Sequence, residues 1–170
     1  MVVGAKGGPG GREDPESSEA ERVATDLDDT DAEGRLQLQS GGLAFFVAAI
    51  RECFEEAGVL LAYGDDGELI RLEDPEKAAE VEALRARLNS GEESFLDLAH
   101  HQGWRLAVDR MHYWAHWITP EGQPKRYDTR FFLPTAPPGQ TAVPDDGEPV
   151  DPARGTPQRA TRKVETPGAR

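Results

Sequence analysis

The sequence predicts an α/β fold, because helical and strand patterns follow one another along its middle part. Apolar residues recur at helical spacing through residues 43–58. A run of mainly aliphatic residues at 59–63 comes directly after this segment and predicts a buried strand. A second strand is predicted at 126–133, where RYDTRFFL alternates polar and apolar residues. Together these patterns predict a chain that contains both helices and strands.

Composition divides the chain into three parts. The 170 residues are enough for one domain. Large apolar residues cluster in 43–143, so we expect the hydrophobic core to come from this segment. Residues 1–42 are rich in Gly and acidic residues, and 144–170 are predicted to be a flexible tail.

Charge and cysteine content limit the classes of partner. A formal net charge of −13 argues against broad binding to nucleic acid. Cys53 is the only cysteine, so no internal disulfide can form, which fits a reducing compartment. No apolar run approaches the roughly 20 residues of a membrane span, and the N-terminus lacks the apolar region of a secretory signal. We therefore expect a cytoplasmic protein without a membrane partner.

The first half of the chain contains two expected helices and two expected strands. A short helix is expected within 26–42, before a pair of glycines. The main helix, 43–58, leads into the strand at 59–63. A tight turn is expected at 64–67, and 68–72 is expected to return as a second short strand.

Capping signals place two further helices. Asp74 precedes a proline and predicts the N-cap of a helix that ends near 89–91. Ser90 and Glu93 have the spacing of a capping box, which predicts another short helix over 93–101.

Residues 111–118 fit a strand or a helix, and their aromatic enrichment favours a strand. A turn after this segment would join 114–118 to 126–133 as a hairpin. On a helix, His112 and His116 could bind zinc, but the intervening residues do not complete an HExxH motif.

The main helix carries a cluster of acidic side chains. Glu52, Glu55 and Glu56 fall within about 100° of one another on a helical wheel, opposite the apolar face. Such a cluster can be a solvated acidic face, or it can bind a hard divalent cation, which prefers carboxylate oxygens. Gly58 is placed to end the helix in a left-handed turn.

The string from Arg51 to Val59, REx2EExGV, resembles the second half of the Nudix box, GX5EX7REUXEEXGU, with Cys53 at the U position. The similarity extends over roughly residues 8–150 and includes WAHWITPEGQPKRYDTRFFL. It resembles the Nudix branch of the peroxisomal coenzyme A diphosphatases and their bacterial relatives, in which an insertion splits the box. Pro9-Gly10-Gly11 matches the first piece of the split box.

This resemblance implies an α/β/α sandwich with a mixed β-sheet. It implies hydrolysis of the pyrophosphate of a small nucleoside diphosphate-linked substrate, such as coenzyme A or a related molecule, with Mg²⁺ or Mn²⁺. The residues that it implies are Glu52, Glu55 and Glu56 as metal ligands, Glu52 and Arg51 as catalytic residues, and Gly11 and Gly58 as structural glycines.

The sequence also departs from the family pattern. Ser17 stands where the box has an acid, with Glu16 beside it. Only eight residues precede Pro9, so we expect a sheet that is incomplete at its N-terminal side. The alternative to an enzyme is therefore a truncated, inactive Nudix-like fragment or an interaction module. Three basic residues could meet phosphates or face solvent: Lys125, Arg126 and Arg130.

Overall fold

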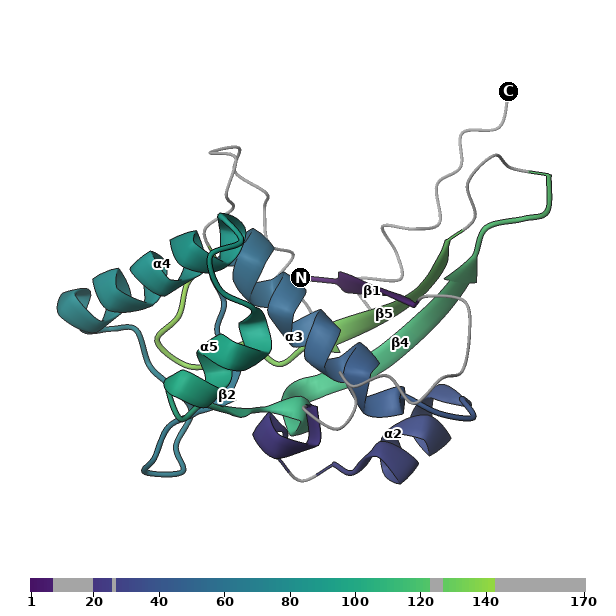
Figure 1. Cartoon of the computed structure of the whole chain (residues 1–170), viewed down its shortest axis with the longest axis horizontal. Coiled ribbons are helices and arrows are strands. Elements are labelled where there is room, and N and C mark those ends of the chain that lie inside the picture. Colours follow the sequence, from purple (N-terminus) through teal and green to yellow (C-terminus); the bar gives the residue numbers. More distant parts are fainter. Residues whose placement is uncertain (8–19, 26, 123–126, 143–170) are drawn as a thin grey trace.

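The computed structural model describes residues 1–7, 20–25, 27–122 and 127–142 (Figure 1). Its helices are α2 (Asp29–Leu36), α3 (Gly42–Ala57), α4 (Pro75–Asn89) and α5 (Phe95–His101), with a short 3-10 helix at Val108–Arg110. Its strands are β1 (Val3–Gly7), β2 (Ala62–Tyr63), β3 (Arg105–Leu106), β4 (Met111–Ile118) and β5 (Asp128–Pro134).

The strands form two sheets, and α3 lies across the larger one (Figure 1). The larger sheet has the order β1-β5-β4, and both of its pairings are antiparallel. β2 and β3 pair antiparallel in the smaller sheet, and an isolated bridge between Ala24 and Leu106 adds a parallel pairing beside them. The predicted α/β fold class is confirmed.

The N-terminal residues contribute a strand that the sequence signals only weakly. Val3 pairs with Phe132, and Val3 and Ala5 are buried. Buried residues also come from the segment that leads into α3, among them Val23 and Leu36. The expectation that the core comes from 43–143 alone was therefore wrong, because the sheet and α3 recruit apolar side chains from both sides of residue 43.

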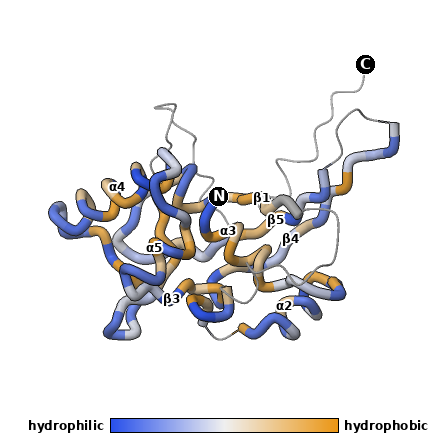
Figure 2. The backbone as a smooth tube through the Cα atoms, viewed as in Figure 1, coloured by the Kyte–Doolittle hydropathy of each residue, from blue (hydrophilic) through white to orange (hydrophobic). Residues whose placement is uncertain are grey.

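Helix α3 is the central element of the core. Its apolar side chains are fully buried at Leu43, Phe46, Ile50, Cys53 and Phe54. The Phe46 and Phe132 rings pack in a T-shaped arrangement with 4.9 Å between their centroids, which joins α3 to β5. Hydrophobic colours follow α3 and β1 in Figure 2. The predicted helix at 43–58 is confirmed, with its start one residue earlier.

The strand predicted at 59–63 is shorter in the structure. Only Ala62 and Tyr63 form β2, although the residues before them are buried. The Gln140 side chain binds the backbone that a neighbouring strand would otherwise pair with. It accepts from Leu60 N at 2.9 Å and donates to Leu60 O at 2.9 Å and to Ile70 O at 2.7 Å. The return strand expected at 68–72 reduces to a single bridge between Tyr63 and Leu69.

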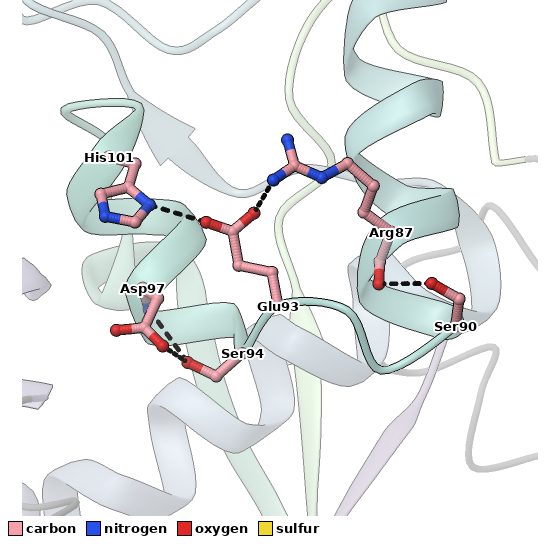
Figure 3. Close-up of polar contacts among 6 residues, drawn as sticks. All are labelled: Arg87, Ser90, Glu93, Ser94, Asp97 and His101. Atoms are coloured by element: carbon pink, nitrogen blue, oxygen red, sulfur yellow. Dashed lines mark hydrogen bonds and ion pairs between the residues drawn. The ribbon is translucent and has the colours of Figure 1, made fainter.

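The N-cap of α5, after the connection from α4, is a different residue from the one predicted (Figure 3). Asp74 caps α4 as expected, by accepting from Glu76 N. The N-cap of α5 is Ser94, whose hydroxyl oxygen accepts from Asp97 N at 3.1 Å, so the capping box assigned to Ser90 and Glu93 was wrong.

Ser90 and Glu93 serve the same connection in other ways (Figure 3). The Ser90 hydroxyl donates to Arg87 O at 2.9 Å. Glu93, only 10% exposed, pairs with Arg87 at 2.8 Å and with His101 at 2.7 Å, which links the two helices. An acidic side chain at this position therefore binds two basic residues across the connection, and the serine one residue later takes the cap.

The predicted hairpin is confirmed as β4 and β5. Its register shifts between Tyr113 and Ala115, which marks a bulge in β4. His112 and His116 lie on β4, where they contact Thr135 and Asp128. Among the described residues, no helix is long and apolar enough to cross a membrane.

Candidate functional site

The candidate site is the acidic face of α3, formed by Arg51, Glu52, Glu55 and Glu56. Arg51 lies between two of the carboxylates. Its Nη2 is 2.7 Å from Glu52 Oε1, and its Nε is 3.7 Å from Glu55 Oε1. Glu52 and Glu55 are 26% and 27% exposed, whereas Arg51 is 44% exposed. Arg51 therefore pairs with both carboxylates, and these contacts span one turn of the helix.

The electrostatic environment of the acidic face favours binding of a cation or a proton. Partial burial raises the pKa of Glu55, and the charges of Glu52 and Glu56 raise it further, while Arg51 opposes the shift. One guanidinium thus does not offset both the burial and the two neighbouring carboxylates. A bound cation would lower the pKa of Glu55 again, because it favours the ionised form.

The C-terminal end of α3 is fixed by Gly58. This residue has φ 63°, and the amides of Gly58 and Val59 donate to Phe54 O at 3.0 Å and Cys53 O at 3.1 Å. These two bonds form the left-handed helix end predicted from the sequence. The turn leaves the acidic residues on the last two turns of the helix.

Arg85, on α4, also binds this helix end, and sequence reasoning missed it. Its side chain is 2% exposed, and it donates to Glu55 O through Nε at 3.0 Å and Nη2 at 2.8 Å. A Cβ added at Gly58 would lie 3.2 Å from Arg85 Nη1, so glycine leaves room for the guanidinium. The only sequence signal is an arginine on the face of α4 that also holds Val81 and Leu88, both buried.

The donor atoms at this face suit a hard divalent cation, but they are not gathered around one point. Carboxylate oxygens are the ligands that Mg²⁺ prefers, and it commonly binds one or two of them together with water and phosphate. In the part of the chain that the structure describes, no group of three or more His, Cys, Asp or Glu residues could hold a metal ion. The assignment of Glu52, Glu55 and Glu56 as ligands therefore stays a prediction.

A cavity of about 240 Å³ lies beside the acidic face, with Arg51 in its wall. Small residues of α3 line one side, and the start of α5 lines the other. The lining residues are Ala20, Ala44, Val47, Ala48, Arg51, Ser94, Phe95 and Leu96. Arg51 is the charged residue among these lining residues, and it links the cavity to the acidic face.

Several predicted residues cannot be placed. Gly11 and the rest of Pro9-Gly10-Gly11 lie outside the described residues, as do Ser17, Lys125 and Arg126. Arg130 is described, and it is buried on β5 facing α3. The described part of the predicted site is thus the second half of the box together with Arg130.

An REx2EExGV string on a glycine-terminated helix, packed across a sheet, defines the class of a Nudix domain. The family model of the NUDT19 Nudix domain matches residues 8–167, and the chain belongs to this family.

Two curated relatives carry the name acyl-coenzyme A diphosphatase NUDT19. The Homo sapiens protein is 34% identical over 128 residues, which cover 70% of this chain and 33% of the relative. The Gallus gallus protein is 34% identical over 105 residues, which cover 55% of this chain and 28% of the relative. The chain thus spans about a third of the length of these relatives. Among solved structures, a NUDIX hydrolase from Alicyclobacillus acidocaldarius matches with a TM-score of 0.43 and 24% identity, over 80% of this chain and 61% of that one.

Proposed function

We propose that the chain is a metal-dependent Nudix hydrolase that cuts the pyrophosphate of coenzyme A or a related nucleoside diphosphate-linked compound. The observation that carries the proposal is the Arg51 pairing with Glu52 and Glu55 on the helix that Gly58 ends. Membership of the NUDT19 Nudix domain family supports the reaction class. The names of the two relatives support an acyl-coenzyme A substrate.

The residues of α3 would divide the work. Nudix hydrolases generally use divalent metal ions, and here Glu52, Glu55 and Glu56 would hold Mg²⁺ or Mn²⁺. The bound ion would supply Lewis-acid polarisation of the diphosphate. Arg51 holds one oxygen of Glu52, so the other oxygen of that carboxylate can accept a proton from an attacking water.

Turnover is the direct test. The purified chain is incubated with Mg²⁺ or Mn²⁺ and with coenzyme A, an acyl-coenzyme A, ADP-ribose or NADH, and products are separated by chromatography. We expect cleavage of a coenzyme A compound that EDTA abolishes. A folded protein that cleaves none of the four compounds contradicts the proposal.

A matched substitution separates chemistry from folding. We expect Glu56→Gln to lose metal-dependent turnover while its circular dichroism spectrum stays that of the wild type, because the carboxamide is nearly isosteric but a weak ligand for a hard cation. Glu76→Gln on α4 is the control, because Glu76 is an exposed first-turn residue of another helix. Equal activity of Glu56→Gln and wild type contradicts the ligand assignment.

The second candidate is a Nudix-like interaction module without catalytic activity. The observation that favours it is the lack of a three-donor group among the described residues. It predicts that Mg²⁺ or Mn²⁺ leaves the melting temperature unchanged, whereas a metal-binding hydrolase gains stability in proportion to RT ln(1 + [metal]/Kd).

The cytoplasmic location expected from the sequence remains a prediction.

A further inference from the structure

Arg130 is a buried cation with an unused hydrogen-bond donor. Its side chain is 6% exposed, and its Nε is buried without a hydrogen-bond partner among the described residues. A buried charge is costly unless hydrogen bonds and opposite charges compensate it. An unsatisfied donor on such a group therefore calls for an acceptor that binds from outside the chain.

The contacts that Arg130 does make hold its guanidinium at one position. The Phe45 ring of α3 lies under it, with Cζ 4.7 Å from the ring centroid. Asp128 Oδ1 is 3.1 Å from Nη1. The same Oδ1 is 2.6 Å from His116 Nε2, so Arg130 and His116 share one carboxylate oxygen. Compensation by Asp128 is thus divided between two basic side chains.

In the cluster of Arg130, Asp128 and His116, the arginine is buried and its two neighbours are partly exposed. Asp128 and His116 are 45% and 29% exposed, whereas Arg130 is shielded by the sheet and by Phe45. An anion can therefore approach past Asp128 and His116. A half-exposed carboxylate such as Asp128 is screened by water, which weakens its repulsion of an incoming anion.

The cluster lies on the same stripe of α3 as two predicted metal ligands. Glu52 and Glu56 follow Phe45 by seven and eleven residues, which places each of them within about 20° of Phe45 around the helix, on either side of it. Phe45 and Glu52 are about 10 Å apart along the helix axis. One extended ligand can therefore reach both the acidic face and Arg130.

We propose that Arg130 binds a phosphate group of the substrate, and that Asp128 and His116 are positioning residues for its guanidinium. The proposal rests on the proposed function, because it assigns the phosphate to the substrate of the acidic face. Guanidinium is well suited to phosphate, since it offers several N–H donors in one plane. A phosphate oxygen at Nε would satisfy the donor that the protein leaves without a partner.

The first test measures binding without any metal. ADP, inorganic phosphate and pyrophosphate are titrated in EDTA onto the wild type, Arg130→Met, Arg130→Lys and the control Arg71→Met. Arg71 is 60% exposed and lies outside the cluster. We expect the wild type and the control to bind ADP, Arg130→Met to bind at least tenfold more weakly, and Arg130→Lys to lie between them. Competition by inorganic phosphate alone would show that the site recognises an isolated phosphate.

The second test uses the sign of the stability change. Replacing an incompletely compensated buried cation by an apolar side chain is often neutral or stabilising. We therefore expect the ligand-free melting temperature of Arg130→Met to equal or exceed that of the wild type. A purely structural Arg130 predicts the opposite sign, and that result, or unchanged ADP affinity in a folded Arg130→Met or Arg130→Lys protein, overturns the proposal.

The outcomes separate this inference from the hydrolase proposal. With a substrate that the wild type cleaves, Arg130→Lys should raise KM several-fold and change kcat less. Binding of ADP that depends on Arg130, in a protein that cleaves nothing, would refute the hydrolase and retain the phosphate site. Turnover with an unchanged KM in the Arg130 variants would support the hydrolase proposal and refute the phosphate site. A wild type that binds none of the three probes would also refute the phosphate site.

Discussion

Gly58→Ala is the substitution whose cost the structure resolves best, because the chain contains a matched control. Gly58 and Gly91 have φ 63° and 75°, so alanine at either position must adopt the left-handed region. That conformation costs an L-residue about 1–2 kcal/mol. A Cβ at Gly91 would meet nothing within 4 Å, whereas a Cβ at Gly58 would meet Arg85 Nη1 at 3.2 Å. The difference between the two variants therefore isolates the contact with Arg85.

The size of that difference follows from what holds Arg85. Its Nε and Nη2 donate to Glu55 O, so a small displacement lengthens two charge-assisted hydrogen bonds in a buried place. Loss of one such bond costs about 1.5–3 kcal/mol. We expect Gly91→Ala to lower the free energy of unfolding by about 1 kcal/mol and Gly58→Ala to lower it by about 3 kcal/mol.

Urea unfolding followed by circular dichroism measures both values, provided that the slope m is the same for both variants. A double-mutant cycle with Arg85→Leu adds a check, because the contact term should vanish once the guanidinium is gone. Equal costs for the two glycine substitutions would refute the reasoning. They would show that Arg85 can shift without losing its bonds to the end of α3.

Other predictions concern the same helix. Phe54→Ala should lower the free energy of unfolding by about 3–5 kcal/mol in urea titrations, because the ring is fully buried against Trp104. Glu56→Gln in EDTA should be no less stable than the wild type, and a loss of several kcal/mol would make Glu56 a structural partner. The folded-state pKa of Glu55 is raised above 4.5, so its contribution to stability is present below that pH and is lost as the pH rises through the folded value. Glu55→Gln should thus be at least as stable as the wild type at pH 7 in EDTA, with an advantage that fades below pH 4.5. Burial raises the pKa of the Cys53 thiol, so a thiol reagent at pH 8 should modify it only after unfolding.

Local signals were sufficient for the elements whose structure depends on nearby residues. The apolar period of α3, the glycine that ends it and the proline after Asp74 each act within a few residues, and the structure confirms all three. The hairpin of β4 and β5 was also predictable, because its two strands are close in sequence and rich in aromatic residues.

The features that were missed depend on partners far away in the sequence. β1 contains two glycines and a lysine, and it is a strand because β5 pairs with it. Gln140 replaces a strand ladder at Leu60, which no local pattern around Leu60 could indicate. Arg85 is buried only because α4 places it at the end of α3.

The candidate site also contains residues that the sequence could identify and one that only the tertiary structure singled out. The sequence motif identified Arg51 and its carboxylate partners, and their spacing along one helix determines that they meet. It named Arg130 only as one of three basic residues that could meet phosphates. The contact between Arg130 and Phe45 brings together a strand and a helix, so only the tertiary structure could single it out.

The place of β5 in the middle of the larger sheet has a consequence for how the chain folds during synthesis. Among the described strands, β1 comes first along the chain and β5 last, yet they pair directly. Contacts between such distant segments form late, because a long loop must close first. At a translation rate of about 5–20 residues per second, α2, α3, α4 and α5 leave the ribosome well before β5 does. Until β5 emerges, the apolar face of α3 and the N-terminal strand have no sheet to join, so nascent chains expose them for several seconds.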